Sequence, residues 1–202
     1  MNVAPIAAVI LAAGGSTRLG QPKQLVHVDG QPLVRRTAQT AIDAGFSLVI
    51  VVLGSAADAV RAAISDLPVR CTANPSWREG VGTSIACGIR AVSDNQLAGC
   101  LVLPCDQIML TAATLSTLLY RFRQGDKQVV ASRYAETVGP PAIFASALFG
   151  QLMELRRDTG AKPILRMASH TATINFPGGE IDIDTEEDLR KIRTIVGKPP
   201  RK

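Results

Sequence analysis

The sequence predicts an α/β fold of three layers, in which helices cover both faces of a mostly parallel, twisted, Rossmann-like sheet. One observation is that apolar runs of strand length alternate with segments of helical periodicity along the chain. A second is that the first strands are separated by helices, and βαβ crossovers of this kind produce parallel strands. Because such sheets bind ligands beyond the carboxyl ends of their strands, we expect functional residues there.

The first half of the chain carries the clearest periodicity. Pro32 in a first turn and Gly45 after a last turn mark the limits of the first helix. The apolar runs are short and rich in β-branched residues, as buried strands are. Strands are expected at residues 6–12, 48–53, 68–72 and 98–103, and helices at 32–44, 56–64 and 84–91, with a polar loop at 74–83.

The second half is less regular. Thr111 is the expected N-cap of a helix over residues 111–124, and Asp158 that of a helix ending at Met167. Thr185 and Asp188 form a capping-box-like pair at the start of a final helix over 185–195. Further strands are expected at 128–132, 171–175 and 181–184, and a rigid turn at 139–144 enters a short strand.

Composition predicts one globular domain over residues 1–197, followed by a disordered basic tail at 198–202. Hydrophobic residues make up 47% of the chain and charged residues 19%, and no linker interrupts the pattern. The sequence lacks an apolar run long enough to span a bilayer and the pattern of a signal peptide. We therefore predict a cytoplasmic protein without a membrane partner.

Charge and cysteine content narrow the class of partner. The net charge is +5, but aromatic residues are only 4% and no dense basic stripe precedes the tail, so a nucleic-acid partner is not expected. A small anionic substrate fits this charge. The four cysteines lack C-x-x-C spacing and only two histidines are present, which argues against a structural zinc site.

The stretch from Ala8 to Lys23 predicts a buried strand that delivers a glycine loop to a polyphosphate. Glycines let backbone N–H groups approach an anion, and Arg18 and Lys23 add positive charge. The alternative is a glycine-rich turn with two exposed cations. Asp106 follows the fourth strand, so its carboxylate should face the same site and suits Mg²⁺. A capping or turn residue is the alternative for Asp106.

Several motifs occur together in order along the chain. They are Leu11-Ala12-Ala13-Gly14-x-Ser16-x-Arg18-Leu19-Gly20-x-Pro22-Lys23, Asn74-Pro75-x-Trp77-x-x-Gly80-x-x-x-Ser84, Asp106-Gln107, Gly139-x-Pro141-x-x-Phe144, Asp158-x-Gly160 and Asp182-Ile183-Asp184-Thr185-x-x-Asp188-Leu189. Together they resemble the nucleotidyltransferases of the nucleotide-diphospho-sugar transferase fold. The chain is most similar to the molybdenum cofactor branch of the MobA-like NTP transferases, which contains a cytidylyltransferase and a guanylyltransferase.

The resemblance implies a reaction. It is the Mg²⁺-dependent transfer of CMP from CTP to the phosphate of molybdopterin, with release of pyrophosphate and with a molybdenum hydroxylase as receiver of the product. The segments Ala12-Ala13-Gly14 and Pro22-Lys23 are similar to the cytidylyl type, which favours CTP. The alternatives are a GTP-using guanylyltransferase, an NTP transferase with another phosphate acceptor, an NAD(P)H-dependent reductase on the same scaffold, and a non-catalytic cofactor-insertion chaperone.

The resemblance also assigns site residues. Arg18, Lys23 and Asp106 would be catalytic. The nucleotide would contact Leu11, Ala12, Ala13, Gly14, Gly15, Ser16, Arg18, Lys23, Asn74, Gly80 and Ser84. The acceptor would contact Asp158, Gly160 and Lys162, and the metal would be held by Asp106 with Asp184, or with Asp182 two residues earlier on the same strand face.

The sequence departs from the family pattern at three places. Ile108 and Glu186 stand where proline is usual, and Arg157 stands where glycine often precedes Asp-x-Gly. Ile108 and Arg157 are expected to border the acceptor side, which leaves the identity of the acceptor open. Whether Trp77 touches the ligand or packs as a lid anchor is also open.

Overall fold

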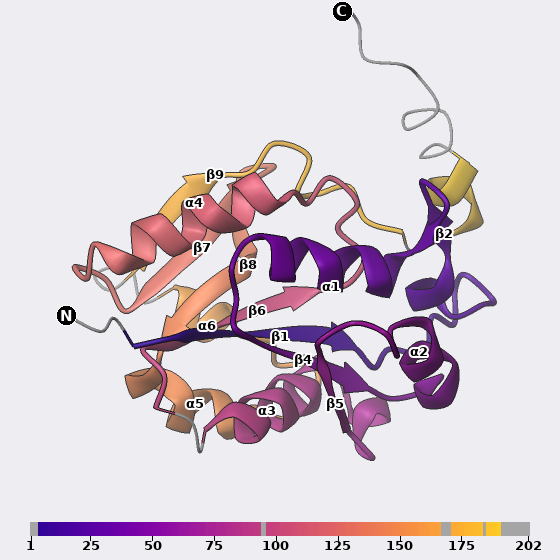
Figure 1. The fold of residues 1–202 in the computed structure, drawn as a ribbon, viewed down its shortest axis with the longest axis horizontal. Coiled ribbons are helices and arrows are strands. Elements are labelled where there is room, and N and C mark those ends of the chain that lie inside the picture. The colour runs from indigo at the N-terminus through magenta and orange to yellow at the C-terminus, as the bar shows by residue number, and fades with distance from the viewer. Residues whose placement is uncertain (1–3, 94–95, 167–170, 184, 191–202) are drawn as a thin grey trace, which may run out of the picture.

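A computed structural model describes residues 4–93, 96–166, 171–183 and 185–190 (Figure 1). Within these residues a seven-stranded sheet has the order β5-β4-β1-β6-β8-β7-β9, and its strands are parallel except for β8. The strands are β1 (Ile6–Ala12), β4 (Leu48–Leu53), β5 (Arg70–Ala73), β6 (Gly99–Pro104), β7 (Val129–Tyr134), β8 (Thr137–Ala145) and β9 (Thr171–Asn175). A separate antiparallel hairpin pairs β2 (His27–Val28) with β3 (Gln31–Pro32).

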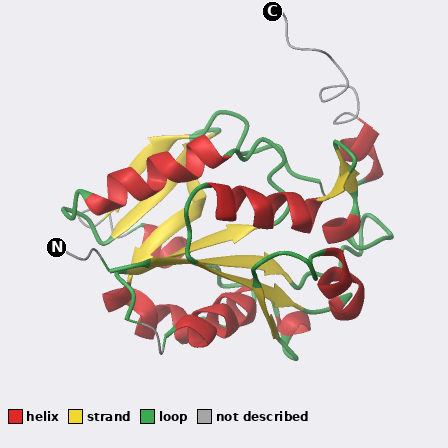
Figure 2. Ribbon diagram, viewed as in Figure 1, coloured by secondary structure: helices red, strands yellow, loops and turns green. Residues whose placement is uncertain are grey.

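Helices cover both faces of the sheet, so the predicted three-layer α/β class is confirmed (Figure 2). The helices are α1 (Leu33–Asp43), α2 (Ala57–Ala63), α3 (Val81–Val92), α4 (Ala112–Arg123), α5 (Phe149–Met153) and α6 (Lys162–Leu165), with 3₁₀ turns η1 (Lys23–Leu25), η2 (Trp77–Glu79) and η3 (Ser146–Leu148). Helices α1, α2 and α4 pack on one face, and α3, α5 and α6 pack on the other. Among these described helices, none has the length and apolarity needed to cross a membrane.

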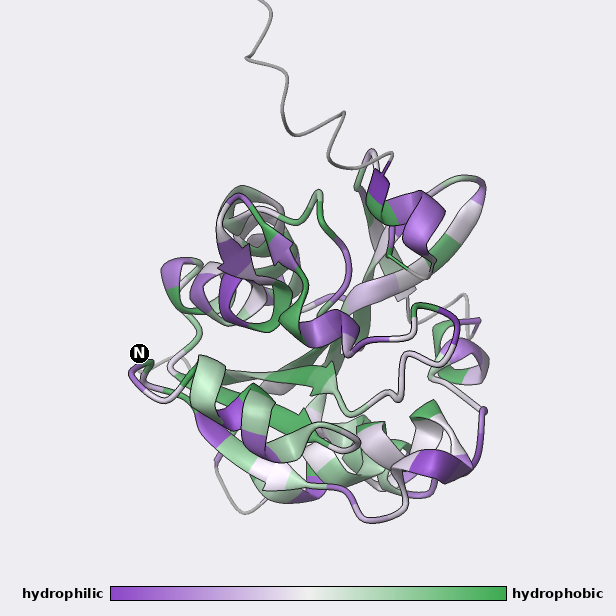
Figure 3. Ribbon diagram, turned by 90° about the vertical axis from the view of Figure 1, so that its right-hand side faces the viewer, coloured by the Kyte–Doolittle hydropathy of each residue, from purple (hydrophilic) through white to green (hydrophobic). Residues whose placement is uncertain are grey.

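The central strand β1 has no polar face, because both of its faces are buried. Ala8 and Ile10 join the core beneath α1 and α4, whereas Ala7 and Val9 join the core beneath α3 and α5. Successive side chains of a strand point to opposite faces, so a strand between two helical layers is apolar throughout. Figure 3 shows the strands in green between helices that carry both purple and green segments.

Most of the expected elements of the first half are confirmed. Strands β1 and β4 have the predicted bounds, and α1 follows Pro32 and ends before Gly45, whose φ of +92° is favourable only for glycine. The helix expected at residues 84–91 begins three residues earlier, at Val81, and its first turn includes part of the expected loop. The hairpin β2–β3 and helix α5 were not expected from periodicity, because both are shorter than the window that periodicity needs.

The expected rigid turn at 139–144 is wrong, because these residues lie inside β8. The reversal occurs earlier, at Ala135 and Glu136, whose φ values of +43° and +59° form a two-residue hairpin turn. Pro140 and Pro141 lie where the register with β7 shifts at a bulge, so their missing N–H groups interrupt a ladder that is already irregular.

Two further expectations near the C-terminus are wrong. Residues 181–183 are not a strand, and the helix expected from Asp158 begins only at Lys162. A backbone hydrogen bond from Gly82 N to Arg157 O, 2.8 Å long, holds the preceding residues in a turn against α3. The Thr185–Asp188 capping box is confirmed by reciprocal hydrogen bonds of 2.9 and 3.2 Å. Asp184, Met167, the end of the final helix and the tail lie outside the described residues.

Helix α3 packs closely on the sheet at Gly88. A Cβ atom at this position would overlap Val9 Cγ1 and would lie 3.0 Å from Val52 Cγ2, whereas one at Gly150 in α5 would meet no atom within 4 Å. We predict that Gly88→Ala lowers the free energy of unfolding by about 1–3 kcal/mol through overpacking. Gly150→Ala should leave it unchanged or raise it by up to about 1 kcal/mol, because alanine is the better helix former. Urea denaturation measures both; equal stability of the two variants would contradict this packing.

Candidate active site

The carboxyl ends of β1 and β6 open into a cavity of about 580 Å³. The two strands are parallel neighbours, with Leu11 opposite Pro104, so the segments that follow them emerge on the same edge of the sheet. The cavity is lined by Leu11, Ala13, Gly14, Gly15, Thr17, Lys23, Gln24, Trp77, Arg78, Gly80, Val81, Ser84, Pro104, Cys105, Asp106 and Asp158. Segments from five parts of the sequence therefore converge at the place where a parallel sheet binds ligands.

The glycine loop after β1 is held in place by its own hydrogen bonds. Ser16 has a φ of +51°; its carbonyl accepts from Leu19 N and Gly20 N at 3.1 and 3.2 Å, and its Oγ accepts from Lys23 N at 2.9 Å. Leu19 anchors the loop in a small apolar cluster that also contains Ile108 and, from the C-terminal part of the chain, Ile183 and Leu189. Gly14 and Gly15 stay exposed at the cavity wall.

The buried side chain of Gln24 holds the start of this loop, a role that the sequence pattern did not predict. Its side chain is buried, and Nε2 donates to Ala12 O at 3.0 Å and to Gly14 O at 2.7 Å. The other amide atom, Oε1, is buried without a hydrogen-bond partner among the described residues. The only signal in the sequence was its place directly after Lys23, and nothing in the pattern distinguishes a buried glutamine from an exposed one.

Lys23 and Asp106 form the ion pair that joins the glycine loop to the end of β6. Lys23 Nζ donates to Asp106 Oδ2 at 2.5 Å, and the two side chains are 21% and 11% exposed. Gln107, the next residue, is buried and donates from Nε2 to Pro140 O and Gly179 O, both at 3.0 Å. The turn after β6 is thus tied to β8 and to the C-terminal segment, which holds the Asp106 carboxylate at the cavity.

Helix α3 supplies the opposite wall through Ser84. Asn74 is buried, and its Nδ2 donates to Ser84 Oγ and Thr83 Oγ1, both at 3.0 Å, while its Oδ1 accepts from Ser76 N. Asn74 does not line the cavity, although Ser84 does. The structure therefore makes Asn74 a positioning residue for Ser84 rather than a contact of the cavity.

Trp77 both packs and faces the cavity. A Cβ on Gly15 would lie 2.8 Å from Trp77 Cζ3, so the absence of a side chain there makes room for the indole ring. Arg78 stacks over the same ring at 4.9 Å from its centroid, in cation–π geometry, and both residues line the cavity. Packing on the loop and contact with a ligand, the two possibilities left open for Trp77, are thus compatible.

The predicted acceptor residues do not all lie together. Asp158 lines the main cavity, whereas Lys162 lines a separate one of about 430 Å³ that also contains Arg133 and Arg166. Gly160 lies beside Val81, outside the lining of the main cavity.

Other predicted contacts are placed as follows. Arg18 is exposed, and neither it nor Asp182 lines the main cavity. Ala12 is buried beneath the loop, and Ser16 shapes the loop from within without lining the cavity. The expectation that Asp184 binds the metal falls outside the described residues.

Ile108, which was expected on the acceptor side, does not line the main cavity. It is 2% exposed and packs with Leu19 in the small apolar cluster, so its role is to anchor the glycine loop. Arg157 is exposed and has a φ of +51°, while its carbonyl accepts from Gly82 N. A left-handed backbone at this position explains why glycine suits it and why arginine is strained there.

The donors around the cavity suit a metal ion that keeps most of its waters. Among the described residues no group of three His, Cys, Asp or Glu side chains could hold a metal, and Asp106 and Asp158 are the carboxylates that line the cavity. Mg²⁺ needs only one or two protein carboxylates when substrate phosphates and water supply the other ligands. Burial, and secondarily the charge of Asp106, raises the pKa of the Cys105 thiol well above its ordinary value, which disfavours thiolate chemistry.

Comparison with known proteins agrees with this fold and identifies the family. The model of the MobA-like NTP transferase domain family matches residues 8–173. Nicotine blue oxidoreductase of Paenarthrobacter nicotinovorans is 30% identical, and the alignment covers 93% of this chain and 96% of that protein. The purine catabolism protein PucB of Bacillus subtilis is 26% identical, and the alignment again covers 93% of this chain and 96% of that protein. The crystal structure of Rv0371c from Mycobacterium tuberculosis has a TM-score of 0.83 at 29% identity, over 98% of this chain and 100% of that one; its complex with manganese has a TM-score of 0.79 at 29% identity, over 93% and 97%.

The chain belongs to the MobA-like NTP transferase domain family. Its fold is that of the nucleotide-diphospho-sugar transferases, and the enzyme class is that of the nucleotidyltransferases.

The amide of Gln24 is predicted to stabilise the glycine loop. We expect Gln24→Met, which keeps the length of the side chain but removes both hydrogen bonds, to lower the free energy of unfolding by about 1–3 kcal/mol, because the buried Ala12 carbonyl and the partly buried Gly14 carbonyl lose their donor. Gln151→Met, on the exposed face of α5, is the control and should change it by less than about 0.5 kcal/mol. Denaturation in urea measures both variants; equal effects would show that Gln24 does not hold the loop.

Proposed function

We propose that the chain is a metal-dependent nucleotidyltransferase that transfers CMP from CTP to the phosphate of molybdopterin and releases pyrophosphate. The observation that carries the proposal is the convergence, in one cavity, of the Gly14–Gly15 loop, Lys23 and Asp106. Exposed backbone N–H groups and a lysine are suited to phosphates, and a carboxylate at the same point is suited to a divalent cation.

The proposed reaction is a displacement at the α-phosphorus of CTP. An oxygen of the acceptor phosphate forms the new P–O bond, and the bond to the β-phosphate breaks with its electron pair leaving on pyrophosphate. Because the attacking oxygen is already an anion at neutral pH, no strong general base is required. Catalysis then depends on alignment and on neutralising the phosphate charges.

Each part of the cavity has a proposed role in this reaction. The glycine loop binds the β- and γ-phosphates, with Arg18 near the leaving pyrophosphate. Lys23 stabilises the charge that develops at the α-phosphate, and its contact with the Asp106 carboxylate keeps the ammonium group at the cavity wall. Ser84, held by Asn74, offers a hydroxyl to the nucleotide.

A divalent cation bound at Asp106 would neutralise phosphate charge and orient the triphosphate. The carboxylate at the end of β6 supports this, as does the manganese complex of Rv0371c, a protein similar to this one. We propose Mg²⁺ as the cation in the cell, with Mn²⁺ as a substitute in vitro. Asp184 and Asp182 remain proposals for a second carboxylate.

CTP and the acceptor are proposed from the sequence pattern. The cytidylyl-like spelling Ala12-Ala13-Gly14 and Pro22-Lys23 supports CTP over GTP, and Ala13 and Gly14 lie at the cavity wall. Asp158, at the cavity, is proposed to contact molybdopterin. Gly160 and Lys162 do not line this cavity, so they would contact only a part of the acceptor that extends beyond it. We propose that the product passes to a molybdenum hydroxylase and that the protein acts in the cytoplasm.

A second candidate function is an NAD(P)H-dependent reductase. The observation that favours it is the 30% identity, over nearly the whole chain, to a relative named nicotine blue oxidoreductase. Hydride transfer to an organic acceptor needs neither a paired lysine and carboxylate nor a divalent cation, whereas this chain has the Lys23–Asp106 pair at its cavity. The pair therefore favours nucleotidyl transfer.

The function is tested by incubating the protein with Mg²⁺, molybdopterin and each nucleoside triphosphate in turn. We predict stoichiometric pyrophosphate release with CTP and at least tenfold less with GTP. Asp106→Asn should reduce the rate by about 10²–10³-fold, because one electrostatic contact to the reacting phosphates is lost. Asp58→Asn, whose carboxylate on α2 is 99% exposed, is the control and should keep full activity.

Two outcomes would overturn the proposal. Absence of pyrophosphate with every triphosphate, combined with NADPH oxidation in the presence of a pigment or quinone, would establish the reductase alternative. Full activity of Asp106→Asn in cofactor delivery would instead indicate a non-catalytic insertion chaperone.

A further inference from the structure

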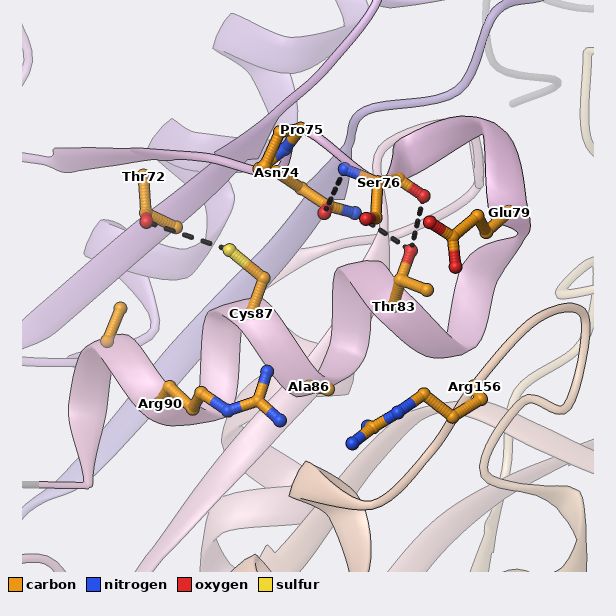
Figure 4. Close-up of a pocket in the computed structure, with 11 residues that line it drawn as sticks. Thr72, Asn74, Pro75, Ser76, Glu79, Thr83, Ala86, Cys87, Arg90 and Arg156 are labelled. Atoms are coloured by element: carbon orange, nitrogen blue, oxygen red, sulfur yellow. Dashed lines mark hydrogen bonds between the residues drawn. The ribbon is translucent and has the colours of Figure 1, made fainter.

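A second cavity, of about 550 Å³, lies against α3 and β5, and no residue that lines it lines the active-site cavity (Figure 4). Its volume is within the range of small-molecule sites. Thr83 and Ser84 are consecutive residues of α3, yet Thr83 lines this cavity and Ser84 the active site. The two cavities are therefore close neighbours with different chemistry.

Two arginines meet at one wall of this second cavity. Arg90 extends from α3 and Arg156 from the loop after α5, and Figure 4 shows their guanidinium groups directed toward the space between them. Arg90 Nη2 donates to Met153 O at 2.7 Å, and Arg156 Nη1 donates to the same oxygen at 2.8 Å and to Leu155 O at 2.9 Å. One carbonyl thus holds two cations side by side.

This pair of cations is incompletely neutralised. Arg156 Nη2 lies 3.8 Å from Glu154 Oε2, a carboxylate that is 81% exposed, and no described residue forms an ion pair with Arg90. Both guanidinium groups donate to the same carbonyl oxygen, so their positive charges lie close together and repel. An anion bound between them would therefore lower the electrostatic energy. Guanidinium groups bind phosphate oxygens through pairs of parallel N–H donors, which favours a phosphate over a monodentate anion.

The opposite wall has a different polarity. Glu79 extends from η2 on the far side of the cavity from Arg90, as Figure 4 shows, with Thr83 and Ser76 beside it. The single proton of Thr83 Oγ1 is already engaged within the protein, because Ser76 O and Gly80 O both lie within hydrogen-bond distance of it. A ligand would therefore present an anionic group at the arginines and a hydrogen-bond donor, or a cation, to the Glu79 carboxylate.

We propose that this cavity is a second binding site, which takes a phosphorylated small molecule with its phosphate between Arg90 and Arg156 and an amine or hydroxyl group toward Glu79. The site goes beyond the nucleotidyl-transfer proposal and does not rest on it, because Arg90, Arg156 and Glu79 have no part in that reaction. Among the residues that line it, Asn74 is the one that also serves the active site, through its hydrogen bond to Ser84. It differs from the active site in using two guanidinium groups in place of a glycine loop and a lysine.

The test uses the full chain, isothermal titration calorimetry and two probes, inorganic phosphate and phosphoethanolamine. Because phosphate could also enter the active site, titrations are repeated in Lys23→Gln, which should retain the second-site binding. Arg90→Gln and Arg156→Gln should each weaken the binding of both probes about tenfold or more, since each removes charged hydrogen bonds. Arg61→Gln, which removes an exposed arginine of α2 paired with Asp58, is the control and should change nothing.

Glu79→Gln should change the affinity for inorganic phosphate in the opposite direction to the arginine variants. It should tighten the binding of inorganic phosphate, because a like charge is removed, and should abolish the preference of the wild-type protein for phosphoethanolamine. Since Glu79 is exposed, this variant carries the test even if Arg90→Gln fails to fold. Unchanged affinity in both arginine variants, or loss of all binding in Lys23→Gln, would overturn the proposal.

Discussion

The contact between Lys23 and Asp106 is the interaction on which the site depends. The two residues are 83 positions apart in the chain, one after β1 and the other after β6, yet Lys23 Nζ lies 2.5 Å from Asp106 Oδ2 at the edge of the sheet. Parallel pairing of β1 with β6 brings them to the same edge, and the ion pair then fixes the glycine loop relative to the end of β6. Its own hydrogen bonds, Gln24 and the cluster around Leu19 hold the loop, and the ion pair sets its position relative to the Asp106 carboxylate.

Small residues let the surrounding elements approach closely enough to enclose that contact. Gly15 leaves room for the ring of Trp77, and the Cβ that Gly82 lacks would lie 2.6 Å from Thr159 O. Gly80 has a φ of +119° and abuts Arg157 and Asp158, so α3 can begin directly beside the turn at residues 157–160. Because backbone comes so near to backbone at α3, the helix forms a wall shared by the two neighbouring cavities.

The fold could be predicted further than the site. Long apolar runs such as 6–12 and 48–53 and a helix with clear limits such as α1 were readable, because burial between two layers leaves a periodic signal. Single contacts leave no such signal: the buried amide of Gln24, the positive φ of Arg157 and the burial of Ile108 depend on the tertiary structure. The family resemblance singled out Lys23 and Asp106 as site residues, but only the structure shows that their side chains are in contact. It also shows that Asn74 and Lys162 do not line the active-site cavity.

A double-mutant cycle on Lys23 and Asp106, with pyrophosphate release from CTP as the measured rate, tests most directly whether the two residues act as one unit. Residues that act together give strongly non-additive effects. We expect Lys23→Gln to reduce the rate by at least about tenfold in the wild-type background and to change it less than about threefold when Asp106→Asn is already present. Additive losses in the double variant would contradict the account, because the loop and the end of β6 would then contribute to the site independently.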